Sequence, residues 1–357
     1  MAHAIFWAAL TCVLYVYFGY PLLLVAWSRL GRRQVKKRDW EPSVSLLIVM
    51  HNESKNVRGK LSNCLDLDYP KNKLQIIVSL DAPTDDTEAL AREYSDAGVA
   101  VMCSHVRRGK AGAINSGMTM ARGQIVVFAD ARQRFARNAV RELVANFADP
   151  SVGAVSGELM LMDGNGREAS NAVGLYWRYE KAIRSMESDI HSVPGASGSI
   201  YAIRRELFRP LPGNTFLDDV TIPMRIVLSG KRAIFDSKAR AYDCVTETPE
   251  QEYEKKVRTL TGNYELFAEM PQLLLPWRNP IFIQMVSHKA GRLIVPHCLG
   301  ALFAANLFLL HGFYLLFFAG QLAWYGLAVM GWISSAQRFR RQAAPAAIPL
   351  AESRKQI

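Results

Sequence analysis

Residues Val44 to Met50 read VSLLIVM, and the polar residues His51, Asn52 and Glu53 follow them directly. A short, continuous apolar run that ends at polar residues is typical of a strand buried on both faces. Such strands occur mostly in parallel sheets that helices cover on both sides. The stretch therefore predicts an α/β fold with a mainly parallel sheet.

The same pattern recurs further along the chain. Apolar runs expected to be strands lie at residues 74–80 (LQIIVSL), 99–103 and 124–128 (QIVVF). Helical stretches alternate with them, at residues 54–67, 85–97, 111–121 and 137–147. Strands that alternate with helices indicate βαβ units, and ligands of such sheets bind outside the carboxyl ends of the strands.

Charged residues stand at those strand ends. Glu53 follows the first predicted strand, Asp81 ends the second, and Asp130 ends the fourth. The third predicted helix begins directly after Arg108, Gly109 and Lys110. Carboxylates and a helix-start cation at one edge suit a ligand with ribose hydroxyls and a metal-bound diphosphate. The sequence has no GxGxxG or GxxxxGK[ST] motif, so dinucleotide oxidoreductases and P-loop ATPases lack their fingerprints.

The first 28 residues contain no Asp, Glu, Lys or Arg, and this run is long enough to cross about 30 Å of hydrocarbon. A basic cluster follows it: Arg29, Arg32, Arg33, Lys36, Lys37 and Arg38. A signal peptide has its basic residues before the apolar run. We therefore expect residues 1–28 to be an uncleaved anchor, with the basic cluster in the cytoplasm. A buried core helix is the alternative.

A second apolar region runs from Leu293 to Gln337 without a formal charge. About 45 residues suffice for two crossings of roughly 20 each, which predicts two transmembrane helices over 293–337. The break between them is expected near His311–Gly312 or near Gly320–Gln321. Residues 271–292, interrupted by three prolines, are expected to form an interfacial amphipathic segment. Residues 338–357 are expected to be a disordered cytoplasmic tail, and residues 40–270 a cytoplasmic domain.

The composition fits a membrane-anchored domain. The chain has 357 residues, half of them hydrophobic, and a formal net charge of +11. The basic residues flank the apolar spans, so an anionic membrane face explains this charge better than a nucleic acid partner does. The five cysteines are scattered without the spacing of a disulfide framework or a zinc site.

From about Val44 to Phe267 the chain resembles the family 2 glycosyltransferases, which bind nucleotide sugars with a GT-A fold. The segments that carry the resemblance occur in the family's order: SLLIVMHNES, IIVSLDAPTDDT, RRGKAGAINSGM, VVFADARQRF and FLDDVTIP. Each segment alone is a weak signal. Five of them in order, with apolar spans on both sides, make a strong one.

The resemblance implies roles for residues of a donor site. Glu53 and Asp81 would bind the base and ribose of a nucleotide-diphosphate sugar, with a UDP-sugar favoured because carboxylates accept hydrogen bonds from a uracil N–H. Lys110 would lie near the diphosphate, and Arg258 would clamp the phosphates. The alternatives are that Glu53 and Asp85 only cap helices and that both cations are solvated.

The resemblance also implies a metal site. Asp130 would bind Mg²⁺ or Mn²⁺ between the two phosphates, where the metal neutralises the departing diphosphate. The family's commonest motif is Asp-x-Asp, but here the second Asp is replaced by Arg132. Arg132 either adds positive charge beside the phosphates or points away from them. A strand-end Asp that only forms hydrogen bonds is the alternative for Asp130.

Asp219 stands where the family has its catalytic base, and Asp218 would support it. Asp219 would take the proton of the acceptor hydroxyl in a single displacement that inverts the anomeric configuration. An N-cap acid is the alternative. Residues 195–198 resemble the acceptor-side loop, and Trp177 either borders the acceptor or belongs to the core. The Gln-x-x-Arg-Trp motif of processive relatives keeps only its Arg, at Arg258.

These expectations combine into one hypothesis and one rival. The hypothesis is an inverting hexosyl-type glycosyltransferase, multi-pass in the cytoplasmic membrane, with a lipid-linked or polysaccharide acceptor. The rival is a catalytically inactive, glycosyltransferase-like membrane assembly partner, which the loss of the second metal Asp suggests. The retained Asp81, Asp130 and Asp219 argue against the rival.

Overall fold

The computed structural model describes residues 1–162, 172–213, 215–244 and 249–343, with side chains except at 172–174, 244, 249–252 and 335–343. The chain divides into two compact units. The larger unit comprises Cys12–Val245 and Arg258–Pro296. The smaller comprises Met1–Thr11, Thr246–Val257 and His297–Ile357.

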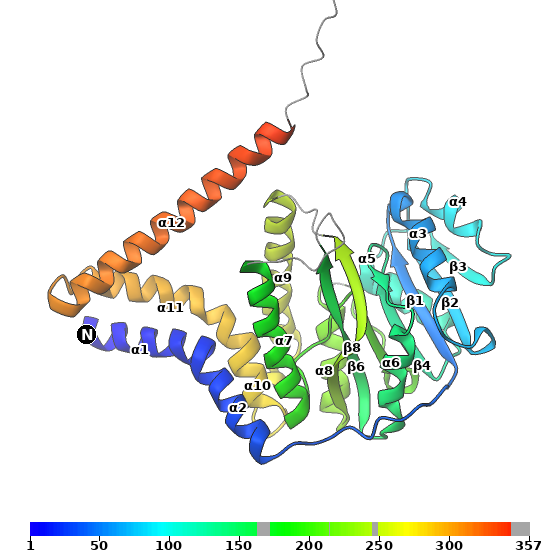
Figure 1. Ribbon diagram of the computed structural model, residues 1–357, viewed down its shortest axis with the longest axis horizontal. Coiled ribbons are helices and arrows are strands. Elements are labelled where there is room, and N and C mark those ends of the chain that lie inside the picture. The colour runs from blue at the N-terminus through cyan, green and yellow to red at the C-terminus, as the bar shows by residue number, and fades with distance from the viewer. Residues whose placement is uncertain (163–171, 214, 245–248, 344–357) are drawn as a thin grey trace, which may run out of the picture. The chain divides into compact units, whose positions relative to one another are not determined.

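The larger unit is built on a sheet that has eight strands within the described residues, in the order β3-β2-β1-β4-β7-β6-β8-β5 (Figure 1). Four neighbouring strands are parallel: β1 (Val44–Met50), β2 (Leu74–Asp81), β3 (Val99–Ser104) and β4 (Ile125–Asp130). This half of the sheet is the βαβ array that the sequence predicts. The carboxyl ends of its strands lie at one edge.

The other half of the sheet is mixed. It contains β5 (Arg134–Phe135), β6 (Val152–Met162), β7 (Ile200–Arg204) and β8 (Arg232–Cys244). Strand β7 runs antiparallel to both β4 and β6, β6 and β8 are parallel, and β5 is antiparallel to β8. The prediction of a mainly parallel sheet is therefore confirmed.

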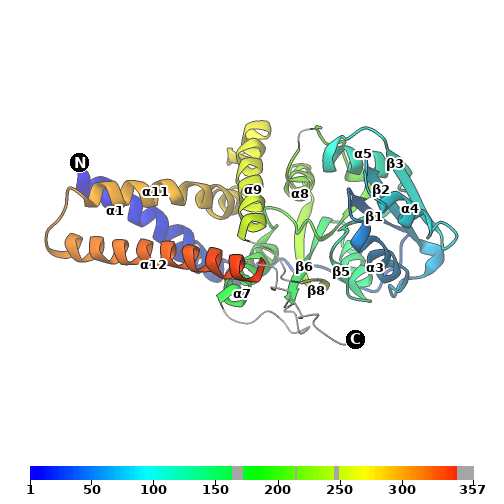
Figure 2. The same ribbon diagram turned by 90° about the horizontal axis from the view of Figure 1, so that it is seen from above.

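Helices cover both faces of the sheet, as the continuous apolar strands require (Figure 2). One face carries α3 (Ser54–Leu65), α4 (Thr87–Arg92) and α6 (Ala139–Ala145). The other carries α5 (Gly109–Met120) and α8 (Asp218–Leu228). Successive residues of β1 alternate between the faces: Leu46 and Ile48 pack in the first apolar core, and Leu47 packs in the second.

Two further helices of the larger unit pack against each other. Apolar residues of α2 (Tyr20–Leu30) and α7 (Ala172–Ile190) form a small buried cluster of Tyr20, Leu24, Ile183 and Ile190. Helix α9 (Pro249–Glu269) is followed by a 3₁₀ turn, Pro271–Leu274, and by a short helix, α10 (Phe282–Gln284). A π-helical turn, Met285–Ala290, then leads directly into α11 (Gly291–Asn306). Continuous helix thus begins inside the segment expected to be interfacial.

Within the described residues, two helices are long and apolar enough to cross a bilayer: Ala2–Leu30, of 29 residues, and Gly312–Ser334, of 23 residues. The first comprises α1 (Ala2–Leu14), a π-helical turn (Tyr15–Gly19) and α2, and the second is part of α12 (Gly312–Ala343). Helix α11, at 16 residues, is shorter than a typical span of about 20. It ends before His311–Gly312, the first of the two expected breaks. A third crossing stays a prediction, and residues 344–357 lie outside the described residues.

Candidate functional site

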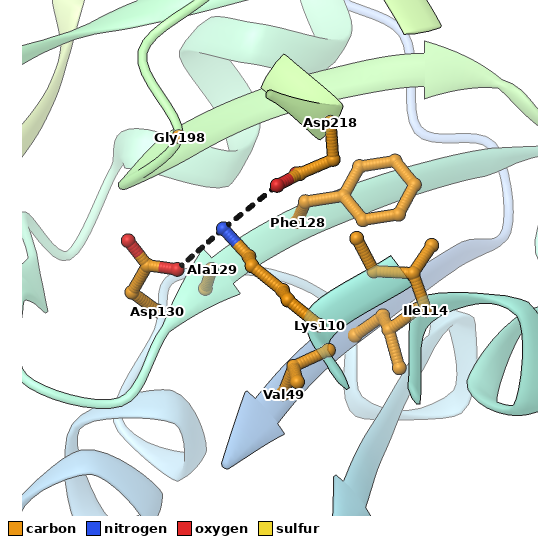
Figure 3. A pocket seen from close by; sticks show the side chains of 9 residues that line it. Val49, Lys110, Ile114, Phe128, Ala129, Asp130, Gly198 and Asp218 are labelled. Carbon is orange, nitrogen blue, oxygen red and sulfur yellow. Dashed lines mark ion pairs between the residues drawn. The ribbon is translucent and has the colours of Figure 1, made fainter. Parts of the chain in front are cut away.

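Three of the expected site residues, Lys110, Asp130 and Asp218, come together at the carboxyl ends of β1 and β4 (Figure 3). Apolar side chains from β1, β4 and α5 form the floor of a pocket there. Charged side chains from α5, β4 and α8 form its rim. The pocket is lined by Leu47, Val49, Lys110, Ile114, Phe128, Ala129, Asp130, Gly198 and Asp218.

Lys110 lies at the centre of this site. It is the second residue of α5, which begins at Gly109 with a φ of +71°, a conformation that favours glycine. Its Nζ lies 3.0 Å from Asp130 Oδ1 and 3.2 Å from Asp218 Oδ1. Burial lowers the pKa of this ammonium, but the carboxylates of Asp218 and Asp130 together raise it more, so the net shift is upward. Lys110 is therefore a permanent cation at the start of a helix, where anions bind.

Asp218 is a buried carboxylate, with 4% of its side chain exposed. Its second oxygen accepts a hydrogen bond of 3.0 Å from the hydroxyl of Tyr201 on β7. The Tyr201 ring stacks on Phe128 of β4, with 4.6 Å between the ring centroids. Asp218 is thus fixed from two sides, as a supporting acid requires. Tyr201 was not predicted, because it lies in the apolar run IYAIR, which indicates only a strand.

Asp219, the predicted base, lies beside the same pocket and is half-buried. Its carbonyl oxygen accepts a hydrogen bond of 2.7 Å from the Ala196 amide, and a Cβ on Gly198 would lie 3.1 Å from its Oδ2. Burial and the carboxylate of Asp218 raise the pKa of Asp219, while Lys110 and Lys289 lower it by less, so the net shift is upward. A raised pKa makes this carboxylate a stronger base than an ordinary Asp.

The turns after β1 and β2 are held in strained conformations. Asn52 and Ala82 have positive φ angles of 51° and 48°, which non-glycine residues rarely adopt. The side-chain amide of Asn52 donates a hydrogen bond to the hydroxyl of Thr84 and accepts one from the backbone N–H of Thr84. Asp81 is buried, and its carboxylate accepts a hydrogen bond of 2.7 Å from the backbone N–H of Arg108. Asp81 therefore orders the loop that leads to Lys110.

Glu53 and Asp85 have different roles. Glu53 is at the N-cap position of α3, but its side chain accepts from the Asn56 side chain rather than from a helix amide. Asp85 accepts from the amides of Thr87 and Ser54 at the starts of two helices. Burial raises the pKa of Asp85, but these hydrogen bonds outweigh it and lower the pKa to about 2. Asp85 therefore caps helices, as the alternative for it states. Glu53 does not cap a helix with its side chain, and its carboxylate lies at the same sheet edge as Asp81.

Arg132 binds Asp243 of β8, at 2.6 Å, and the Gln133 amide donates to the same carboxylate. This contact pairs the guanidinium of Arg132 with a carboxylate of the chain itself, and its position relative to the phosphates stays a prediction. Asp130 remains as the carboxylate of the motif, about one-third exposed. Among the described residues, no group of three or more His, Cys, Asp or Glu gathers to hold a metal ion. Oxygen donors of Asp130 fit a hard divalent cation if donor phosphates and waters complete its shell.

Two other expected residues lie outside this cluster. Arg258 is exposed on α9. One turn further along, Gly262 packs closely against the side chain of Leu217, the residue before Asp218, so α9 passes near the start of α8. No contact joins Arg258 to the pocket within the described residues. Trp177 of α7 is 37% exposed, so the core alternative for it is wrong.

A mainly parallel sheet with a cation, a metal-type Asp and a helix-start pair of acids at its strand ends defines a GT-A domain, the class that binds nucleotide sugars. Residues 45–211 match the sequence profile described as "Glycosyl transferase family 2", so this part of the chain is similar to that family. The resemblance seen in the sequence is therefore confirmed.

Two relatives illustrate the similarity in sequence. The chain is 27% identical over 243 residues to "Probable glycosyltransferase YdaM" of Bacillus subtilis (strain 168), which covers 62% of this chain. It is 26% identical over 253 residues to "Poly-beta-1,6-N-acetyl-D-glucosamine synthase" of Staphylococcus aureus (strain COL), which covers 68% of this chain. The chain spans only 55% and 60%, respectively, of the length of these two proteins.

A solved structure matches nearly the whole chain. The mannosyltransferase PcManGT from Pyrobaculum calidifontis, determined in complex with GDP-Man and Mn²⁺, is 25% identical, with a TM-score of 0.69. The match covers 92% of this chain and 98% of that one. The similarity therefore extends beyond the GT-A domain to the flanking helices.

Proposed function

We propose that this protein is a membrane-anchored glycosyltransferase that transfers a hexose from a nucleotide-diphosphate sugar to a lipid-linked or glycan acceptor, with inversion. The observation that carries the proposal is the convergence of Lys110, Asp130 and Asp218 on one strand-end pocket, with Asp219 next to the lining residue Gly198. A purely structural domain has no need to bring three carboxylates and one ammonium together beside a solvent-accessible pocket.

The donor binds with its diphosphate at Lys110. The ammonium and the N-terminus of α5 both attract phosphate oxygens. Glu53 follows strand β1, and Asp81 ends the neighbouring strand β2. There they accept hydrogen bonds from the base and ribose of the donor. A UDP-sugar is the favoured donor. Because PcManGT was determined in complex with GDP-Man, a guanosine donor is the second one to test.

Asp130 is the residue that would hold Mg²⁺ or Mn²⁺, together with the donor phosphates. When bound, such an ion neutralises negative charge on the departing nucleoside diphosphate. The Mn²⁺ of the PcManGT structure supports divalent-metal dependence in the family. In this chain Lys110 supplies a second positive charge at the same position.

The transfer step is a single displacement. Asp219 accepts the proton of the acceptor hydroxyl while that oxygen forms a bond to the anomeric carbon. The bond from that carbon to the diphosphate breaks, and its electron pair leaves with the nucleoside diphosphate toward Lys110. Attack on the face opposite to the leaving group inverts the configuration. Asp218 keeps Lys110 and the start of α8 in place during this step.

The rival function, an inactive assembly partner, has one observation in its favour: Arg132 replaces the second motif Asp and is bound to Asp243. An inactive protein would keep the fold without turnover. The retained Lys110–Asp130 and Lys110–Asp218 pairs favour the enzyme.

One assay separates the two functions. The full-length protein, purified in detergent, is incubated with a panel of UDP- and GDP-sugars, with Mn²⁺ or with a chelator, and released nucleotide is measured. The matched control is the Asp219→Asn variant. We expect the wild-type protein to release nucleotide from at least one donor faster than this variant does. Equal background release by both proteins on every donor would support the inactive partner.

A further inference from the structure

Two cations, Lys289 and Arg184, lie next to the acceptor-side loop, residues 195–198. The ammonium of Lys289 lies against Gly195: a Cβ there would be 3.6 Å from Lys289 Nζ. Arg184 of α7 donates a hydrogen bond of 2.6 Å to the hydroxyl of Ser156, which also accepts the Ser197 amide at 2.9 Å. The loop thus lines the donor pocket through Gly198 and lies next to the two cations through Gly195 and Ser197.

The other charges next to this loop are neutralised by one another. Glu180 pairs with Arg292 and lies 3.2 Å from His288 Nε2. His288 Nδ1 lies 2.8 Å from Glu187 Oε1. Burial lowers the pKa of His288, but Glu187 and Glu180 together raise it more, so the net shift favours imidazolium. Two carboxylates and two cations therefore form a balanced network.

The positive charges of Arg184 and Lys289 are not paired with a carboxylate in this way. Lys181 is paired with Glu158 at 2.7 Å. Arg184 and Lys289 have no carboxylate within 4.0 Å among the residues whose side chains are described. Burial lowers the pKa of Lys289, and Asp219 opposes the shift without cancelling it. Burial likewise lowers the pKa of Arg184, and the more distant Glu187 and Glu180 oppose the shift without cancelling it. Two half-buried cations that no carboxylate contacts directly are costly unless an anion binds them.

The first apolar helix, Ala2–Leu30, contacts the elements that carry Arg184 and Lys289. The hydroxyl of Tyr20 donates to Glu187 at 2.6 Å, and that of Tyr15 bonds Ser287 at 2.8 Å. The hydroxyl of Tyr179 donates to the carbonyl of Tyr17 at 2.8 Å. Arg184 and Lys289 therefore lie on elements that contact a helix long and apolar enough to cross a bilayer, and Lys289 also lies near the proposed base, Asp219.

From these positions we infer that Arg184 and Lys289 form a subsite for the phosphate of a lipid-linked acceptor. This inference rests on the proposed function, and it selects the lipid-linked acceptor over a free glycan. The lipid chain follows the first apolar helix, the phosphate binds the two cations, and the group beyond the phosphate reaches Asp219. Lys289 and Arg184 are thus substrate-binding residues that act on the acceptor and not on the donor.

The test measures binding of three probes to the full-length protein in detergent micelles. The probes are a polyprenyl phosphate, the matching polyprenol and inorganic pyrophosphate, and UDP and GDP binding is measured in parallel. We expect the polyprenyl phosphate to bind at least about tenfold more tightly than the polyprenol, since a charged hydrogen bond is lost without the phosphate. Equal binding of the two lipids by the wild-type protein would overturn the inference without any variant. Pyrophosphate binding as tight as that of the lipid would overturn the lipid assignment.

Variants assign the effect to the two residues. Lys289→Gln and Arg184→Gln should each weaken polyprenyl phosphate binding roughly tenfold, and Lys289→Arg should restore most of it. Lys238→Gln, an exposed cation of β8, is the matched control and should bind as the wild type does. Loss of nucleotide affinity in Lys289→Gln, with lipid affinity intact, would overturn the inference. Absence of nucleotide binding in the wild type would instead refute the proposed function.

Discussion

Asp219 is the residue on which the proposed chemistry depends. Asp219→Asn keeps nearly the same shape but cannot accept the acceptor proton, so we expect a loss in kcat of about 10²- to 10⁴-fold. Donor KM should stay nearly unchanged, because the interaction is made only in the transition state. Initial rates with the donor found in the panel assay measure both quantities.

Asp218→Asn is the matched control for this prediction, and its effect on transfer should be milder. The reason is that Asp218 contacts Lys110 and Tyr201 rather than an acceptor. If Asp219→Asn turns over near the wild-type rate and Asp218→Asn is inactive, the base is Asp218 and not Asp219. Full activity in both variants would remove the mechanism.

The pH dependence of transfer follows from the raised pKa of Asp219. Below that pKa the carboxylate holds a proton and cannot act as a base, so the rate rises with pH through it. The acid limb of the kcat/KM profile, which reports the free enzyme, should therefore lie above about 3.9, the pKa of an ordinary Asp. Rates and thermal unfolding measured on the same samples separate this limb from acid denaturation. A rate independent of pH down to ordinary Asp values would contradict the assignment.

At the scale of elements, the pair between Arg132 and Asp243 ties the turn after β4 to strand β8. Asp243 is nearly buried, with 5% of its side chain exposed, and Arg132 is 40% exposed. Arg132→Ala should lower stability by about 1 kcal/mol, since Gln133 still contacts Asp243. Arg132→Asp should lower it more, because two carboxylates then face each other.

Thermal unfolding in detergent measures both changes, and a loss of about 1 kcal/mol corresponds to a few degrees in Tm. Arg58→Ala is the control, because its pair with Glu93 is exposed on both sides and contributes little. Equal Tm values for Arg132→Asp and the wild type would show that this pair does not tie the two elements.

The elements that could be predicted are those whose signal is local. Strand β1 occupies the predicted residues, because its apolar run and its polar end lie in one stretch of chain. Helix α4, Thr87–Arg92, starts later than predicted, because the Asp85 carboxylate is bound by the amides of Thr87 and Ser54 and stays outside the helix. The helix also ends at Arg92, before the predicted end at residue 97.

The parts of the site that could not be predicted depend on pairing between distant segments. Tyr201 meets Asp218 only because β7 inserts antiparallel beside β4, and an apolar run does not encode its neighbour. Lys289 reaches Gly195 across more than 90 residues of sequence. Arg132 illustrates the same limit: its orientation depends on Asp243, which the sequence does not link to it.

For the whole molecule, the charge pattern predicts a topology. The basic cluster after residue 28 and the arginines after residue 337 both follow apolar spans, so both should be cytoplasmic. Reporter fusions at Arg38 and Arg341 should therefore both give a cytoplasmic signal. An extracytoplasmic signal at either position would refute the proposed placement of the domain at the cytoplasmic face.

The central claim is that the pocket around Lys110 binds the diphosphate of a nucleotide sugar, and calorimetric titration with UDP and GDP tests it most directly. The full-length wild type should bind at least one of them, and Lys238→Gln should match it. Lys110→Gln should bind at least about tenfold more weakly, because it loses a charged contact to phosphate. Binding of neither nucleotide by the folded wild type, or unchanged affinity in Lys110→Gln, would contradict the claim.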